Sequence, residues 1–150
     1  MQSMDVSMAK GDDLPDILDL LRRCQLLETG VAEAIGHFCL ARSSGTLVGC
    51  ARLETYGDVG LLRSVAVSPA VRGSGLGAKL VGFVADRARA RGVRQLFLLT
   101  TTAPSFFERL GFHVVERSAV PIPVAESWEF RVGCPQTAVA MRFELMEARS

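Results

Sequence analysis

Apolar and polar residues change their spacing several times along the chain, and the first regular pattern predicts a helix. Apolar positions recur three and four residues apart between Pro15 and Cys24, the spacing of one face of an amphipathic helix. Asp12 or Asp13 can cap this helix, with Pro15 in its first turn. A less regular segment is expected over residues 26–35.

Three strand-like runs follow, over residues 37–42, 47–56 and 59–67. Each is rich in apolar residues and bounded by residues typical of turns. Ser43-Ser-Gly-Thr joins the first two runs, and Tyr56-Gly-Asp joins the second and third. The pattern therefore predicts an antiparallel meander.

The second half alternates helix and strand patterns. Leu76, Leu80, Val84 and Ala88 predict an amphipathic helix that ends near Gly92. A buried strand over 95–100, a short helix over 103–110, a strand over 111–116 and a last strand over 138–146 are expected next, with a proline-interrupted stretch at 120–124. The order indicates a mixed α+β fold in which a β-loop-α-β crossover follows the meander.

Length and composition limit the classes of protein to consider. The 150 residues, 49% of them apolar, suit a single domain over residues 1–150. A net charge of +1 provides no general attraction to nucleic acid or to an anionic membrane. The N-terminus lacks the features of a secretory signal, and the four cysteines have no metal-ligand spacing. We therefore expect a cytoplasmic protein with reduced thiols and no metal.

A glycine-rich loop opens the helix that begins at Leu76. Glycines 73, 75 and 77 allow sharp turns and close approach of a ligand, and Arg72 adds a positive charge. Free N–H groups at a helix start bind anions. A dinucleotide fold would require an acidic residue at the end of the next strand, and a P-loop would require Gly-Lys-Ser/Thr; the sequence has neither. These two nucleotide-binding folds are therefore disfavoured, and the glycines either bind another anion or form a plain turn before the helix.

The segment Val65-Ala-Val-Ser-Pro-Ala-Val-Arg-Gly-Ser-Gly-Leu-Gly resembles the acetyl-coenzyme A motif of the GNAT N-acetyltransferases, and Ala103-Pro-Ser-Phe-Phe-Glu-Arg-Leu-Gly-Phe resembles the second motif of that family. The resemblance covers essentially the whole chain. It implies an α+β acyltransferase fold with a central mixed sheet of about seven strands flanked by helices, and an enzyme that uses acetyl-coenzyme A without a metal. Pantetheine would run between two splayed parallel strands. The implied cofactor-binding residues are Val65, Ala66, Val67, Arg72, Gly73, Ser74, Gly75, Leu76, Gly77, Ala78, Thr100 and Phe107.

The sequence departs from that family at the groups that move protons. Phe107 stands where many members have a tyrosine acid, and Arg63 stands near their usual strand glutamate. Glu54 is the leading candidate for the base, since it shares a strand face with Arg52 beside the strand that carries Arg63; the alternative is a solvated strand carboxylate. Arg63 is a candidate clamp for a carboxylate or half of a structural ion pair.

Other polar residues are candidates for the acceptor site. Arg52 joins Arg63 as a substrate-binding candidate, and Thr101 and Thr102 follow the strand that should border the thioester. The alternative for both threonines is capping of the next helix. Trp128 can either wall a pocket or pack in the core.

The identity of the acceptor depends on a finer resemblance. Residues 99–103, 106–112 and 134–141 resemble a GNAT subgroup associated with bacterial arsenic-resistance operons, whose relatives acetylate phosphinothricin-like amino acids. We therefore expect a small-molecule amine, with an amino acid or toxic analogue as the leading class. A protein or peptide acetyltransferase, or a non-catalytic acetyl-coenzyme A sensor, is the alternative. A homodimer is expected from the family.

Overall fold

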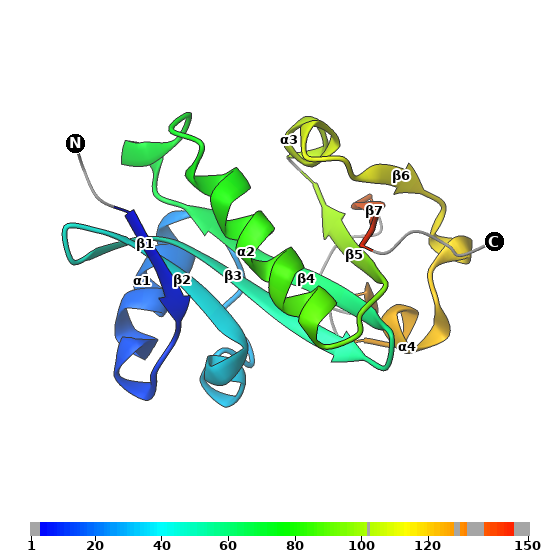
Figure 1. Ribbon diagram of the computed structural model, residues 1–150, viewed down its shortest axis with the longest axis horizontal. Helices are drawn as coiled ribbons and strands as arrows, with labels where there is room; N and C mark the ends of the chain where they lie inside the picture. The colour runs from blue at the N-terminus through cyan, green and yellow to red at the C-terminus, as the bar shows by residue number, and fades with distance from the viewer. Residues whose placement is uncertain (1–3, 102, 128–129, 132–136, 146–150) are drawn as a thin grey trace. The chain divides into compact units, whose positions relative to one another are not determined.

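The computed structural model describes residues 4–101, 103–127, 130–131 and 137–145. Its seven strands form one mixed sheet in the order β1-β2-β3-β4-β5-β7-β6 (Figure 1). This arrangement confirms the expected α+β class. The strands are β1 (Met4–Met8), β2 (Phe38–Ser43), β3 (Thr46–Tyr56), β4 (Val59–Val67), β5 (Gln95–Thr100), β6 (His113–Val115) and β7 (Val139–Glu144). The helices are α1 (Leu14–Arg23), α2 (Leu76–Ala90), α3 (Pro104–Arg109) and α4 (Ile122–Ala125), with 3₁₀ turns η1 (Gly11–Asp13), η2 (Ala32–His37), η3 (Pro69–Val71) and η4 (Arg117–Ala119).

The chain divides into two compact units, each discontinuous in sequence. Unit 1 comprises Met1–Leu53 and Ser64–Asp86, and unit 2 comprises Glu54–Arg63 and Arg87–Ser150. Strands β3 and β4 contribute residues to both units. A single domain over residues 1–150 stays a prediction. In the part of the chain that the structure describes, no helix has the length and hydrophobicity needed to cross a membrane.

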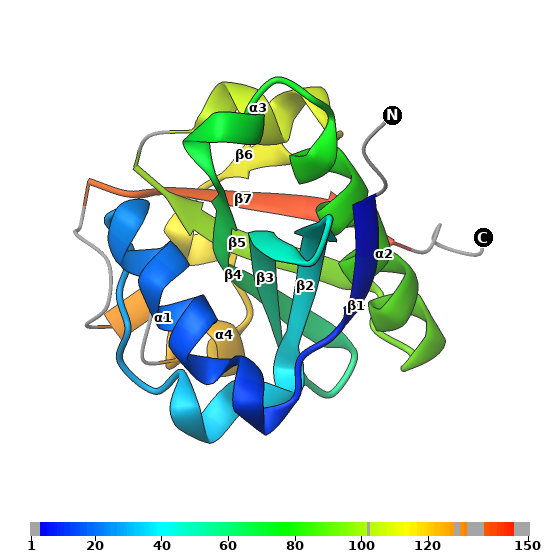
Figure 2. The same cartoon turned by 90° about the vertical axis from the view of Figure 1, so that its left-hand side faces the viewer.

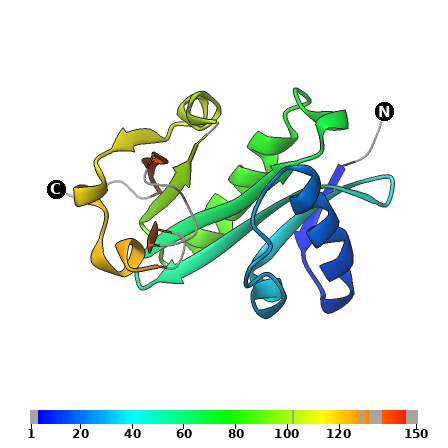
Figure 3. The same cartoon turned by 180° about the vertical axis from the view of Figure 1, so that it is seen from behind.

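In unit 1, helices cover both faces of an antiparallel sheet (Figure 2). The core under α1 contains Ile17, Leu20 and Leu21, packed with β-strand residues that include Leu40 and Cys50. Figure 3 shows α1 and the following segment over these strands from behind. Alternating side chains of a strand point to opposite faces, so the neighbouring positions of β3 face the start of α2.

The approach of α2 to β3 depends on Gly49. A Cβ added at Gly49 would lie 2.6 Å from Cδ1 of Leu80 and 3.4 Å from the carbonyl oxygen of Ala66. Leu80 is fully buried, so its side chain has little space to move away. The absence of a side chain at Gly49 therefore allows α2 to pack closely against β3 near its first turns.

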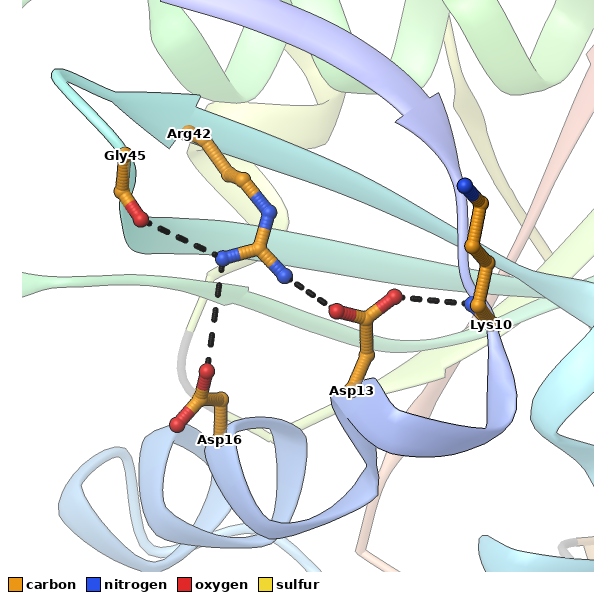
Figure 4. Close-up of polar contacts among 5 residues, drawn as sticks. All are labelled: Lys10, Asp13, Asp16, Arg42 and Gly45. Atoms are coloured by element: carbon orange, nitrogen blue, oxygen red, sulfur yellow. Dashed lines mark hydrogen bonds and ion pairs between the residues drawn. The ribbon is translucent and has the colours of Figure 1, made fainter.

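Arg42 links the start of α1 to the turn between β2 and β3 (Figure 4). Its guanidinium donates to the carboxylate of Asp13 and to the carbonyl of Gly45 at 3.4 Å, and it lies 4.0 Å from the carboxylate of Asp16. Asp13 occupies the N-cap position of α1 but does not cap it; its other oxygen accepts the N–H of Lys10 at 2.8 Å. The predicted cap is therefore in the expected place but stabilises the preceding turn.

Unit 2 is built around β5. The first three residues of β5, Gln95–Phe97, pair in parallel with β4 from Val59 to Leu61, and all six pair antiparallel with β7. β7 then pairs with β6 on its other edge. The core beside these strands includes Leu61, Phe97, Val124 and Phe130. The last strand in sequence is therefore inserted between two earlier ones.

Most predicted elements are confirmed within two residues, and the differences have local causes. The proline-interrupted stretch, to which the sequence pattern assigns no element, forms the one-turn helix α4. Pro123 lies in its first turn, where a backbone N–H would have no partner within the helix. His37 closes the 3₁₀ turn before β2 instead of starting the strand. β6 ends at Val115, and β7 ends at Glu144, while residue 146 lies outside the described residues.

Candidate functional site

The glycine-rich loop of unit 1 has the geometry that anion binding requires. Gly73 and Gly75 both have left-handed backbones, with φ of +83° and +86°, and a Cβ at either position would meet nothing within 4 Å. Helix α2 begins directly after them, and the N–H of Lys79 donates to the carbonyl of Gly75 at 3.1 Å. The N–H groups of residues 76–78 precede this first helical hydrogen bond and point along the helix axis. Backbone donors and the helix dipole therefore converge on an open surface.

Arg72, expected to contact phosphate, is directed toward the end of β4. Its Nε donates to the carbonyl oxygen of Val67 at 3.1 Å, and a terminal nitrogen lies 3.7 Å from the Cys24 sulfur. The Cys24 thiol in turn lies 3.6 Å from the same carbonyl. The Arg72 side chain is exposed and long, so it can reorient when an anion binds. The Ser74 hydroxyl is also committed locally, to the carbonyl of Val71.

The strand that leads to this loop contains an unusual residue that the sequence did not reveal. Ser64, in the interior of β4, has φ of +55°, a conformation costing a non-glycine residue about 1–2 kcal/mol. Its carbonyl oxygen accepts from the thiol of Cys50 at 3.4 Å. Val65, Ala66 and Val67 follow, with Ala66 buried and both valines half-buried. Strained residues concentrate at functional sites, so this interruption marks β4 independently of the loop.

Burial perturbs Cys50 strongly. The side chain is fully buried, and desolvation of the thiolate, with a smaller contribution from Cys24, raises its pKa from 9.0 to about 12. The Ala66 backbone also hydrogen bonds to this thiol, which acts in the opposite direction. Cys50 is therefore protonated near neutral pH and can donate its S–H to Ser64.

In unit 2 the structure brings Glu54 and Arg63 together. Nη1 of Arg63 lies 3.2 Å and 3.3 Å from the two carboxylate oxygens of Glu54, and the Tyr56 hydroxyl lies 3.3 Å from one of them. The Arg63 side chain is 6% exposed and that of Glu54 16%. Glu54 is thus held by two donors in a poorly hydrated place, so it is not the solvated carboxylate of the alternative interpretation.

Tyr56 is a contact that sequence reasoning missed. It is the only tyrosine of the chain. Because Phe107 stands where the family often has a tyrosine, the presence of a single tyrosine elsewhere was the one sequence feature that could have drawn attention to Tyr56. The Phe107 ring is buried, with ring centroids 5.0 Å from Phe106 and 5.6 Å from Phe112 in edge-on geometry. Phe107 therefore anchors α3 in an aromatic cluster and offers no proton.

The remaining candidates are placed separately. The hydroxyl oxygen of Thr100 accepts the N–H of Ala103 at 3.1 Å, which fixes the turn into α3. Thr101 is exposed. Arg52 lies opposite Phe38 in unit 1, half-buried, near Gly30. Thr102 and Trp128 lie outside the described residues.

Two further observations concern the groups that could contact a ligand. Among the described residues, no group of three or more His, Cys, Asp or Glu side chains is arranged to hold a metal ion. Parallel pairing of β4 with β5 ends at Leu61 and Phe97. Backbone donors and acceptors beyond those positions are therefore outside that ladder, as a ligand that pairs with strand backbone requires.

Comparison with known proteins gives the family. A family model described as "Acetyltransferase (GNAT) domain" matches residues 34–114, more than half of the chain. The amino-acid acetyltransferase of Neisseria meningitidis serogroup A is 30% identical over 129 residues, which is 79% of this chain and 29% of the relative. That of Aeromonas salmonicida is 33% identical over 122 residues, 74% of this chain and 27% of the relative. The chain thus spans less than a third of the length of these curated relatives.

Solved structures agree with this result. N-acetylglutamate synthase from Neisseria gonorrhoeae, complexed with coenzyme A and N-acetyl-glutamate, has a TM-score of 0.86 at 25% identity, covering 97% of this chain and 36% of that one. Rv2747 from Mycobacterium tuberculosis, in complex with CoA and NLQ, has a TM-score of 0.79 at 28% identity, covering 95% of this chain and 99% of that one. The match to the family model spans β4, the glycine-rich loop, α2 and α3. This chain belongs to the GNAT acetyltransferase family.

Proposed function

We propose that this protein transfers an acetyl group from acetyl-coenzyme A to the amine of a small amino acid or an amino-acid analogue. The observation that carries the proposal is the pair of left-handed glycines, Gly73 and Gly75, at the start of α2 with open space beside both. A pyrophosphate needs close approach to backbone N–H groups, and a side chain at either position would obstruct it. Several relatives named above act on amino acids or were crystallised with coenzyme A, which supports the same class.

The cofactor is proposed to bind along the end of β4 and the following loop. Backbone of Val65 and Val67 would pair with the amides of pantetheine, and residues Arg72–Ala78 would hold the pyrophosphate. Arg72 would then exchange its contact with the Val67 carbonyl, now 3.1 Å long, for a charge-assisted contact to a phosphate oxygen. The same exchange would remove the Arg72 contact from the Val67 carbonyl and leave it with the Cys24 thiol.

The chemistry requires an unprotonated amine and stabilisation of the thioester oxygen as it gains charge. We assign the first task to Glu54, which takes the amine proton directly or through one water molecule. Arg63 and Tyr56 hold its carboxylate in one orientation. The second task falls to a backbone N–H at the positive-φ interruption of β4 at Ser64, which we call the Ser64 bulge, because a left-handed φ turns backbone groups away from their regular strand directions.

The acceptor is proposed to carry a carboxylate. Arg63 supplies a positive charge whose side chain is 6% exposed and which already lies against the Glu54 carboxylate, and a guanidinium is the side chain best suited to recognising a carboxylate. Arg52, Thr101 and Thr102 are the further candidates for acceptor contacts. Within this class, phosphinothricin-like toxic analogues, the acceptors of the arsenic-resistance subgroup, are the finer proposal.

The test is calorimetric titration of the purified chain with acetyl-coenzyme A, followed by measurement of thiol release over a panel of amines. The panel contains L-glutamate, L-glutamine, other amino acids, phosphinothricin, and the amide of each amino acid that reacts. Saturable binding with thiol release on a free amino acid, and much weaker release on its amide, supports the proposal. Absence of binding refutes it, release only on peptides favours a protein acetyltransferase, and binding without release on any amine favours a sensor.

A further inference from the structure

We propose that Cys50 is a positioning residue for acetyl transfer, which holds the Ser64 bulge of β4 in the conformation that presents a backbone N–H to the thioester. This inference rests on the proposed function, since it gives the bulge its task. Cys50 lies on β3, in the core under α1, and is fully buried. Its thiol contacts β4 from the face of the sheet that α1 covers, and it does not contact the reacting atoms.

The thiol engages the backbone on both sides of Val65. Its sulfur lies 3.4 Å from the carbonyl oxygen of Ser64, and the Ala66 backbone hydrogen bonds to the same sulfur. A thiol is both a weak donor and a weak acceptor, so one side chain satisfies a carbonyl and an N–H that flank a single residue. These contacts restrict rotation of the peptide groups on either side of Val65.

The bulge needs such support because its backbone is strained. Ser64 has φ of +55° without being a glycine, and strained conformations persist only where the surroundings over-determine them. The Cys50 S–H donates to the Ser64 carbonyl oxygen, and because burial keeps the thiol protonated, this donor is present over the whole neutral pH range. Loss of this donor should let the bulge relax toward a regular strand.

A series of substitutions at Cys50 separates the hydrogen bond from packing. Cys50→Ser keeps a donor of similar size, Cys50→Val fills the apolar space without a donor, and Cys50→Ala removes both. We expect Cys50→Val and Cys50→Ala to lower kcat by roughly 10-fold or more, the order of loss caused by displaced catalytic groups, with KM for acetyl-coenzyme A within about 3-fold. Cys50→Ser should retain kcat within about 3-fold. The matched control is Cys39→Val, a buried thiol on β2 whose sulfur lies 3.6 Å from the Met8 sulfur; it should leave kcat unchanged.

A double-mutant cycle with Ser64→Gly gives the decisive test. Glycine adopts a positive φ without strain, so the bulge no longer depends on Cys50 in that background. The effect of Cys50→Ala on kcat should shrink to less than about 3-fold, a coupling that a purely structural role at a distance would not produce. An equal loss of kcat in both backgrounds overturns the proposal, as does wild-type kcat in Cys50→Val.

The same cycle, measured by urea unfolding without ligand, distinguishes the two proposals. Coupling between Cys50→Ala and Ser64→Gly in the urea midpoint, with no turnover by the wild type, refutes the proposed function but leaves the support of the bulge by Cys50 intact. Coupling in stability without coupling in kcat shows that Cys50 only stabilises the fold and overturns its assignment as a positioning residue.

Discussion

Replacement of Gly75 by valine tests the cofactor loop most directly, because the structure separates the strain of the substitution from its effect on a ligand. Gly75 has φ of +86°, and a Cβ there would meet no atom within 4 Å. The Cβ of the new side chain therefore meets open space in the free protein. Its cost is the left-handed backbone of a side-chain-bearing residue, about 1–2 kcal/mol of unfolding free energy. The variant should fold.

The effect on acetyl-coenzyme A should be much larger than the effect on stability. A β-branched side chain at the mouth of the loop would keep the pyrophosphate from the backbone N–H groups at the start of α2. Loss of two charge-assisted hydrogen bonds, at about 1.5–3 kcal/mol each, corresponds to roughly 100-fold to 10,000-fold in Kd. Calorimetric titration measures this change.

Gly45 provides a matched control within unit 1. It has φ of +83° in the turn between β2 and β3, and a Cβ there also meets nothing within 4 Å. Gly45→Val should therefore lose a similar amount of stability in urea unfolding while keeping the affinity of the wild type for acetyl-coenzyme A. If the two variants bind acetyl-coenzyme A within about 3-fold of each other, the loop is not the pyrophosphate site.

Three further predictions concern the base, the start of α1 and the buried thiol. Glu54→Gln should lower kcat by about 100-fold or more, the usual contribution of a general base, with acetyl-coenzyme A affinity within about 3-fold; unchanged kcat would exclude Glu54 as the base. Asp13→Asn should destabilise the protein by about 1–2 kcal/mol in urea unfolding, because it weakens the contacts to Arg42 and to the turn before α1, whereas Asp19→Asn, in an exposed ion pair, should cost less than about 0.5 kcal/mol; equal losses would contradict the role of the Arg42 contacts. The folded pKa of Cys50, about 12, lies above its ordinary 9.0, so its contribution to stability is complete below pH 9 and is lost toward pH 12, by about 1.4 kcal/mol per pH unit; Cys50→Val should show a shallower decline over that window, and an identical decline would show that the thiol does not titrate as inferred.

The elements that local patterns specify were predicted well. Apolar periodicity located α2 and β5, and turn residues located the hairpins, because these depend on spacing and on residues that favour particular backbone angles. The order of strands in unit 2 was not predictable in this way. Pairing of β5 with β7 joins Gln95 to Glu144, and no local pattern records which distant strand completes an edge.

The same division applies to the candidate site. The anion-binding loop was predicted because glycines before a helix carry a physical signal. A structural ion pair was one of the two interpretations of Arg63, but no sequence signal identified Glu54 as its partner. Ser64 gave no signal, since a serine with positive φ cannot be distinguished by residue type from one in a regular strand. Its support by Cys50 depends on packing across strands.

The place of β7 has a consequence for the order in which the protein assembles during synthesis. β5 emerges from the ribosome well before β7. Its pairing with β4 covers only three residues, and its other edge, which pairs with β7, stays open until the chain from Val139 onward is available. β6 has no partner in its described pairings except β7. Closing this late, long-range contact should be slow relative to the local hairpin of β2 and β3. Unit 2 should therefore be the last part of a nascent chain to resist proteolysis.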